Sequence, residues 1–162
     1  MKYIAVIEKA TSNYSAFVPD VPGAVGIGKT LEAATESVAQ GLALHLYELQ
    51  ASGAALPVPT PREQLDVTEY EPEEPFELLY VEAARMNPVS LELEKALEAT
   101  GVSRAELARR MNTTPSAISR LTDPFYFGHS TKTLASAATA LGAALQINFV
   151  QPSSVATAQI LL

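Results

Sequence analysis

The sequence predicts an α+β protein in two parts, in which a small sheet covered by one helix is followed by a set of short helices. Short β-rich segments separated by turn residues open the chain, and an apolar stripe at helical spacing follows them. The charge then changes sign. Residues 1–100 hold 6 basic and 16 acidic side chains, a net charge of −10, whereas residues 101–162 hold 5 and 2, a net charge of +3. Opposite signs indicate two modules that meet different partners.

The first part follows a β-β-β-α-β pattern. A polar turn at residues 9–13 joins the first two strands, and prolines within residues 19–23 end the second strand. Thr30 is the expected N-cap of a long helix that ends at Ser52-Gly53. The predicted strands cover residues 3–7, 14–18, 24–27 and 76–81. One helix covers only one face of this sheet, so the other face needs a partner or a second copy.

The composition excludes several classes of protein. The 162 residues are 48% hydrophobic and include no cysteine and only two histidines. A disulfide scaffold, a thiolate zinc site, a cysteine nucleophile and a histidine metal cluster are therefore not expected. No apolar run reaches the ~18 residues of a membrane span, and Glu8 comes too early for a signal peptide. We therefore expect a cytoplasmic protein with no membrane association, in which His45 is packed or at an interface and His129 lies on the surface.

Carboxylates of the first part offer two functional interpretations. Glu8, Asp20 and Glu36 lie near the ends of predicted elements, where paired carboxylates could hold metals for phosphoryl chemistry. Their spacing matches no ligand pattern, so we predict no catalytic residue, no metal and no cofactor.

Residues 54–75 contain five prolines and six acidic residues. A solvated acidic loop is the expectation there, and a docking surface for a basic partner is the alternative.

The second part contains two short helices joined by a three-residue turn. Ser103, with Glu106 three residues later, predicts a capping box at the start of the first helix. Asn112 sits in the turn, where a left-handed residue is needed. Thr114 is the expected N-cap of the second helix, and Pro115 occupies its first position. This arrangement is a helix-turn-helix.

The outward side chains of this motif suit DNA. The second helix would present short polar groups and one guanidinium to base edges in a major groove, while Arg109 and Arg110 would meet phosphates. A generic helical bundle with scattered arginines is the alternative. The predicted DNA-binding residues are Ser103, Arg104, Arg109, Arg110, Thr114, Ser116, Ala117, Ser119, Arg120 and Lys132.

Further elements flank the motif. Helices are predicted over residues 89–100 and 131–141, and a strand over residues 145–150. A lone strand must pair with something, so we expect a second subunit, in a two-fold homodimer on a palindromic site; pairing into tetramers stays open. The expected domains are residues 1–85 and 86–150, and a tail over residues 151–162 that either frays or adds a dimer contact.

Two resemblances cover about four fifths of the chain. Residues 103–121 closely resemble the phage-repressor (Xre-type) helix-turn-helix. Three N-terminal segments resemble HicB antitoxins: Tyr3 to Glu8, Tyr14-x-Ala16-x-Val18-Pro19-Asp20-x-Pro22-Gly23, and Gly28-x-Thr30-Leu31-Glu32-Ala33-Ala34. The second resemblance implies a partial ribonuclease-H-like, non-catalytic N-terminal domain whose partner is a HicA toxin, a small basic ribonuclease. Together they imply an antitoxin that also represses its own operon by binding operator DNA.

The toxin-binding surface is expected in the acidic half of the chain. Its predicted residues are Tyr14, Asp20, Glu36, Glu71, Glu73 and Glu74. Two other classes of function remain as alternatives. One is a ligand-responsive helix-turn-helix repressor with no toxin partner, and the other is a metal-dependent nuclease of the ribonuclease-H type.

Overall fold

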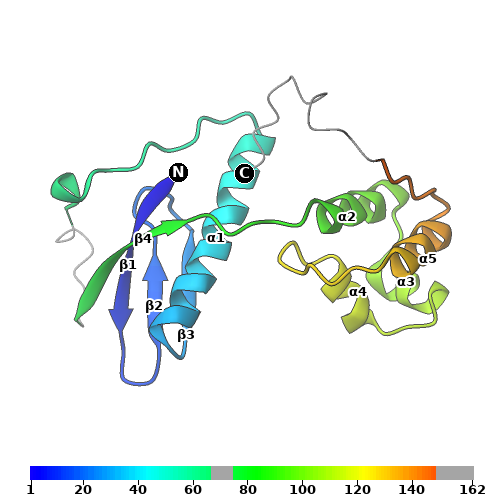
Figure 1. The fold of residues 1–162 in the computed structure, drawn as a ribbon, viewed down its shortest axis with the longest axis horizontal. Coiled ribbons are helices and arrows are strands. Elements are labelled where there is room, and N and C mark those ends of the chain that lie inside the picture. The colour runs from blue at the N-terminus through cyan, green and yellow to red at the C-terminus, as the bar shows by residue number, and fades with distance from the viewer. Residues whose placement is uncertain (67–74, 149–162) are drawn as a thin grey trace. The chain divides into compact units, whose positions relative to one another are not determined.

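The structure, a computed structural model, describes residues 1–66 and 75–148 of the chain (Figure 1). The chain divides into two compact units, unit 1 at Met1–Arg85 and unit 2 at Met86–Leu162, and each is described by itself. Within the described ranges, no helix has both the length and the apolar character that crossing a bilayer requires.

Unit 1 is built on a four-stranded antiparallel sheet. Its strands, in the order β3-β2-β1-β4, are β1 (Lys2–Lys9), β2 (Tyr14–Phe17), β3 (Val25–Gly28) and β4 (Phe76–Glu82). The register of the central strand β1 places Val6 opposite Phe17 on one side and Leu78 on the other. The turn between β1 and β2 is closed by a 3.0 Å bond from the Ala10 N–H to the Asn13 carbonyl. All four predicted strands are confirmed.

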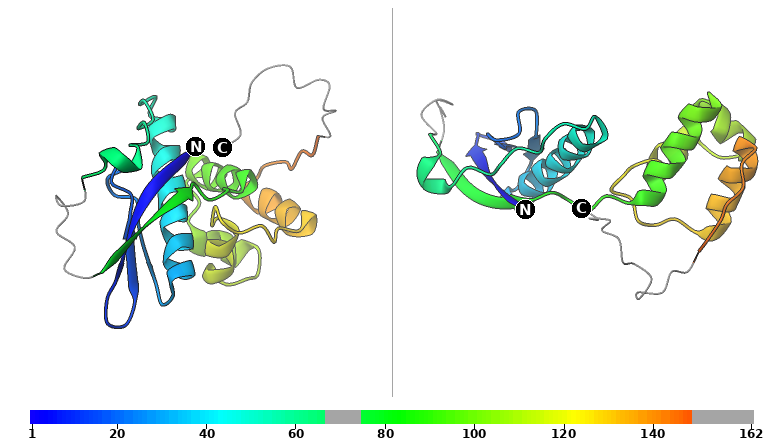
Figure 2. Two further views of the ribbon diagram at one scale, coloured as in Figure 1. Left: turned by 60° about the vertical axis from the view of Figure 1, so that its left-hand side comes forward. Right: turned by 90° about the horizontal axis from the view of Figure 1, so that it is seen from above.

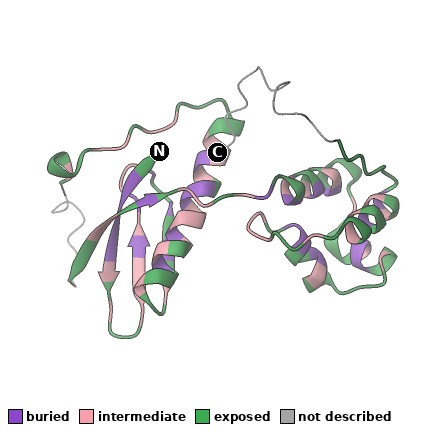
Figure 3. Cartoon of the chain, viewed as in Figure 1, coloured by how far each residue is buried: buried purple, intermediate pink, exposed green. Residues whose placement is uncertain are grey.

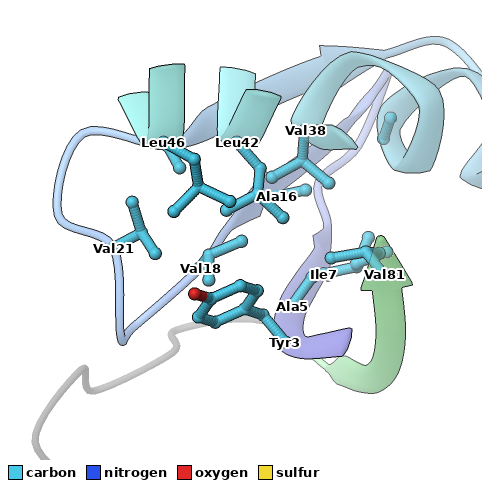
Figure 4. Close-up of a cluster of buried hydrophobic side chains, with 12 residues drawn as sticks. Tyr3, Ala5, Ile7, Ala16, Val18, Val21, Val38, Leu42, Leu46 and Val81 are labelled. Atoms are coloured by element: carbon cyan, nitrogen blue, oxygen red, sulfur yellow. The ribbon is translucent and has the colours of Figure 1, made fainter. Parts of the chain in front are cut away.

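Helix α1 (Leu31–Ala51) runs along one face of this sheet (Figures 1 and 2). The Thr30 hydroxyl accepts the Ala33 N–H at 3.1 Å, and Ser52 is the C-cap, as the sequence predicts. Side chains of the helix and the sheet interdigitate in one apolar core, shown in Figure 4. Its buried members include Tyr3, Ala5, Ile7, Ala16, Val18, Val21, Val38, Leu42, Leu46 and Val81.

Two glycines of β3 set the distance between α1 and the sheet. A Cβ on Gly26 would lie 2.2 Å from the backbone nitrogen of Val38, and a Cβ on Gly28 would lie 2.2 Å from that of Ala34. Only glycine allows a backbone approach this close. Helix α1 therefore packs most extensively on β3, at one edge of the sheet.

The segment after α1 is tied to unit 1 at two points. The Tyr3 hydroxyl donates to the Pro57 carbonyl at 2.8 Å. Thr60 donates its N–H and its hydroxyl to the two carboxylate oxygens of Asp20, at 2.9 and 2.5 Å. A 3₁₀ turn, η1 (Arg62–Gln64), follows. The sequence predicts a solvated loop over residues 54–75; these bonds anchor its first part, and residues 67–74, with four of its six acids, lie outside the described residues.

Unit 2 is a bundle of four short helices around its own core. The helices are α2 (Pro88–Thr100), α3 (Arg104–Arg110), α4 (Pro115–Leu121) and α5 (Thr131–Leu141). Leu97, Leu107 and Ile118 meet at its centre. Gly101 and Gly142 end α2 and α5 in the left-handed conformation, at φ values of 65° and 71°. The predicted helices are confirmed.

The predicted strand over residues 145–150 is wrong in the part that the structure describes. Residues 143–148 have no regular secondary structure, and Ile147 is 58% exposed. The physical reason is that a strand needs a hydrogen-bonded neighbour, and the described part of unit 2 contains only helices. The remaining two residues of that prediction and the 151–162 tail lie outside the described residues.

The close approach at β3 leads to a stability prediction. We expect Gly26→Ala to lower the free energy of unfolding of unit 1 by at least about 2 kcal/mol, because the new methyl group would overlap backbone atoms that cannot move independently. Ile27→Ala, at an exposed neighbour on the same strand, should cost less than about 1 kcal/mol. Calorimetry on the full chain measures both, and equal effects would contradict the role given to Gly26.

Candidate functional site

Helices α3 and α4 form a compact pair whose ends are fixed by side-chain caps. The Ser103 hydroxyl accepts the Glu106 N–H at 3.1 Å, and the Thr114 hydroxyl accepts the Ala117 N–H at 3.2 Å. Between the helices, Asn112 adopts the left-handed conformation at φ 50°, as predicted from the turn. The Thr113 N–H bonds back to the Ala108 carbonyl at 2.9 Å, which closes the turn.

The pair has a clear inner and outer face (Figure 3). On the inner side, Leu107 and Ile118 are fully buried. On the outer side, Ser116, Ser119 and Arg120 are exposed. Among the other predicted DNA-binding residues, Ser103 and Thr114 are exposed although their oxygens act as caps, and Ala117 is only half-buried. Helix α4 therefore presents two hydroxyl groups and one guanidinium to solvent.

Two of the predicted DNA-binding arginines are used inside unit 2. Arg104 donates to the carboxylate of Glu94 at 2.6 Å and to the Thr122 hydroxyl at 3.3 Å, which ties α3 to α2 and to the end of α4. Arg110 donates to the Ala140 carbonyl at 3.0 Å, in the last turn of α5. A cation at a helix C-terminus satisfies carbonyls that have no partner in the helix. These arginines therefore brace the bundle.

Glu106 neutralises the remaining arginine of α3. Its carboxylate accepts from Arg109 at 2.7 and 2.8 Å and from Arg110 at 2.8 Å, instead of completing a capping box with Ser103. Hydrogen bonds from Arg109 and then Arg110 lower the pKa of Glu106 to about 2 and raise the pKa of Arg109. Because the folded pKa is depressed, this contribution to stability is present above the ordinary carboxyl pKa and is lost as the pH falls towards 2.

A polar hollow lies beside the outer face of α4. It has a volume of about 510 Å³ and is lined by residues of the α3–α4 turn, of α4, of the loop before α5 and of α5. Arg120 projects over the ring of Tyr126, 5.3 Å from its centroid, a distance typical of a cation–π contact. Lys132 of α5 also lines the hollow and forms no ion pair among the described residues. Two cations thus border one concave surface.

The loop before α5 is held by a polar cluster that the sequence analysis missed. Asn87 caps α2 through its side-chain oxygen and donates its amide nitrogen to the Tyr126 carbonyl at 2.7 Å. The same amide lies 3.2 Å from Nδ1 of His129, whose Nε2 lies 2.8 Å from the Leu121 carbonyl and 3.3 Å from the Ser90 hydroxyl. The prediction that His129 is a surface residue is wrong, because these contacts draw it into a half-buried position. Only an N-cap signal at Asn87 could have indicated this cluster.

The predicted toxin-binding residues lie apart in unit 1. Tyr14, at the start of β2, packs on the edge of the apolar core. Asp20 uses both carboxylate oxygens to hold Thr60, whereas Glu36 on α1 is exposed. The other predicted residues, Glu71, Glu73 and Glu74, lie outside the described residues. Among the acidic residues of this set that the structure describes, Glu36 is therefore the one that is exposed to solvent.

The carboxylates considered for metal chemistry are also separate. Glu8 accepts a hydrogen bond from Ser15 at 3.2 Å, and Asp20 is held by Thr60. Across residues 1–66 and 75–148, no three histidine, aspartate or glutamate side chains are grouped as a metal site requires. His45 lies half-buried on α1, where its ring would lie 2.8 Å from a Cβ on Gly23.

Comparisons with known proteins bear on the class of this fold. A family model for a HicB_like antitoxin of bacterial toxin-antitoxin systems matches residues 3–92. The chain is 41% identical over 51 residues to a UPF0150 protein of Helicobacter pylori (strain J99 / ATCC 700824), which covers 32% of this chain and 71% of that protein. The family match defines the class as an antitoxin of bacterial toxin–antitoxin systems.

Solved structures of HicB proteins are similar to part of the chain. A HicA3 and HicB3 toxin-antitoxin complex includes a chain with 27% identity and a TM-score of 0.42, which covers 51% of this chain and 96% of that chain. The N-terminal domain of the Burkholderia pseudomallei antitoxin HicB has 21% identity and a TM-score of 0.41, and the match covers 51% of this chain and 99% of that chain. Because the family model spans more than half of its residues, the chain belongs to the HicB-like antitoxin family. Helices α3 to α5 lie beyond that match.

The Asn87 cluster leads to a prediction for unit 2. Asn87→Asp keeps the oxygen that caps α2 but removes the amide donors to Tyr126 and His129. Although a negative charge at this helix N-terminus is favourable, we expect unit 2 to lose about 1–3 kcal/mol of unfolding free energy, because two acceptors of the cluster lose their donor. Thermal unfolding monitored by circular dichroism checks this, and an unchanged melting temperature would contradict the anchoring role.

Proposed function

We propose that this chain is an antitoxin that neutralises a HicA-like mRNA-cleaving toxin through unit 1 and represses its own operon through unit 2. The observation that carries the proposal is the family match over residues 3–92, followed by a pair of short helices with an exposed polar outer face. In this proposal both activities are binding, and no catalytic residue, metal or cofactor takes part.

The DNA-binding part of the proposal rests on α4. A helix that enters the major groove must keep its apolar side on the protein and offer donors on the other side. Ile118 and Leu121 are buried, while Ser116, Ser119 and Arg120 are exposed. An arginine can donate two parallel hydrogen bonds to O6 and N7 of guanine. The Tyr126 ring supports the Arg120 guanidinium and limits the side-chain freedom that binding would otherwise remove.

The phosphate-binding part rests on two exposed cations outside α4. Lys132 at the start of α5 and Arg109 on α3 are exposed, the latter with 74% of its side chain accessible. Arg104 and Arg110 are bound within unit 2, so we assign them a bracing role. Such contacts would position the protein without reading sequence.

We further propose that the protein binds DNA as a two-fold dimer, with half-sites about 34–36 Å apart. Residues 143–148 support this, because they include two exposed apolar side chains, Leu145 and Ile147. Packing against a second copy would bury both side chains.

Arg120 is expected to read a base. We predict that Arg120→Ala reduces the preference for operator over scrambled DNA about tenfold or more, because an arginine–guanine pair contributes about 1–3 kcal/mol of discrimination. Arg109→Ala is the matched control, and it should weaken binding to both DNAs alike. Gel shifts of the full chain measure, for each variant, the ratio of the affinity for operator DNA to the affinity for scrambled DNA. Equal losses on both DNAs for Arg120→Ala would refute the base-reading role.

Glu106 is expected to restrain DNA binding. We predict that Glu106→Gln tightens binding to all DNA sequences and steepens the slope of log affinity against log salt by up to about one, because the Glu106 carboxylate no longer competes with a phosphate for Arg109. Glu92→Gln removes the same charge from α2, where Glu92 pairs with Lys95 at 2.8 Å, and should leave the slope unchanged. If the two variants have the same slope, the proposed competition does not occur.

The whole proposal is tested with the full chain and its cognate toxin. We expect the chain to stop RNA cleavage by the toxin at a stoichiometric ratio and to bind the promoter DNA of its own operon. DNA binding without inhibition of the toxin would favour the ligand-responsive repressor instead. Metal-dependent RNA cleavage by the chain alone, abolished by Glu8→Gln, would favour the nuclease.

A further inference from the structure

A groove of about 480 Å³ runs between the first half of α1 and β4 in unit 1. Its floor is apolar and includes Leu31 from the helix and Leu79 and Val81 from the strand. The chain after β4 crosses the helix near Ala39, where the Ala84 N–H donates to the Ala39 carbonyl at 2.9 Å. The groove is therefore bounded by fixed backbone on the helix, the strand and this crossing.

The groove follows from the way α1 sits on the sheet. Gly26 and Gly28 draw the helix onto β3, and the strand order places β3 and β4 at opposite edges. A helix about 10 Å wide that lies over one edge cannot also cover the other edge. Leu79 of β4 is consequently left half-buried, whereas Val81 near the end of the strand is covered.

The rim of the groove carries three carboxylates. Glu32 and Glu36 project from α1 and Glu82 from the end of β4, and all three are exposed. Hydrogen bonds from its own backbone N–H and from the Thr30 hydroxyl lower the pKa of Glu32. No salt bridge neutralises these carboxylates within the described parts of the chain. The surroundings do not offset the charge, because residues 1–85 contain 5 basic and 13 acidic side chains, a net charge of −8.

We propose that this α1–β4 groove is the docking site for a cationic segment of the toxin, with an apolar side chain of that segment seated on the partly exposed Leu31 and Leu79. The proposal deepens the antitoxin function proposed above and rests on it. It assigns toxin contact to Glu32, Glu36 and Glu82. Of these, only Glu36 belongs to the set that the sequence predicted.

The charges decide between possible occupants. A nucleic acid would bring phosphates against three carboxylates, which is repulsive at close range. A second copy of unit 1 also carries a net charge of −8, so pairing two such surfaces would bring like charges together. A cationic protein surface gains from the rim and can use the apolar floor as a buried anchor, which is where binding energy concentrates in protein interfaces.

The test uses the full chain with charge reversals at the rim. We expect Glu36→Lys/Glu82→Lys to weaken binding to the cognate toxin at least about 30-fold at 0.15 M salt, mostly through slower association, and to lose less affinity at 1 M salt. Glu48→Lys reverses one carboxylate near the other end of α1, and it should alter affinity less than about threefold, whereas Glu36→Lys alone should already weaken binding by more than that. Circular dichroism melting of each variant shows that the fold is kept.

Hydrogen exchange of the wild-type complex gives a second measurement that needs no variant. We expect protection on toxin binding over residues 31–39 and 79–82. The groove proposal would be overturned if the double reversal changed the affinity for the toxin by less than about threefold, or if protection were confined to other parts of unit 1. Either result would leave the proposed antitoxin function standing. Absence of any binding between the wild-type chain and the toxin would overturn the proposed function and the groove together.

Discussion

The contact between the glycines of β3 and the backbone of α1 is the constraint on which unit 1 depends. Without a Cβ at Gly26 and Gly28, the helix axis moves close to one edge of the sheet. That position brings Val38, Leu42 and the neighbouring apolar residues onto the sheet and forms the core. It also leaves the helix side of β4 partly open. The packing that stabilises unit 1 and the groove proposed for the toxin thus have the same physical origin.

Unit 2 divides its charged and polar groups between holding the helices and facing solvent. Arg104 and Arg110 bond to other helices, and the Asn87 cluster fixes the loop that carries Tyr126. Arg120 lies on that ring and remains exposed. The proposed DNA contacts would therefore come from side chains on short helices whose ends are capped and whose connecting loop is anchored, which reduces the entropy lost on binding.

The two units carry different electrostatic surfaces, and each suits a different proposed partner. Unit 1 has an excess of unpaired carboxylates at the groove, whereas unit 2 exposes Arg120 and Lys132 at one concave surface. In the proposed function, a cationic toxin and anionic DNA would then be attracted to separate parts of one chain. This separation allows the proposed antitoxin and repressor activities to coexist in a protein of net charge −7.

Local sequence signals determined most of the fold. The strands, α1 and the four helices of unit 2 were predictable because Thr30, Ser103 and Thr114 are caps and Asn112 is a turn residue, and such effects act over a few residues. The burial of Ile118 on the inner face of α4 was predictable in the same way, from the helical spacing of apolar residues. The predicted strand at residues 145–150 failed because a strand depends on a partner that local sequence does not supply.

Tertiary structure decided what surrounds each of these residues. It joined Asp20 to Thr60, 40 residues apart, and His129 to Asn87, 42 residues apart, so that two residues expected at the surface became structural anchors. It also brought Glu82 beside Glu36 and turned scattered acids into one rim. The sequence by itself determined elements, caps and charge, because these are local or additive. The groove and the anchored loop required the packed fold, because they depend on distances between residues far apart in the chain.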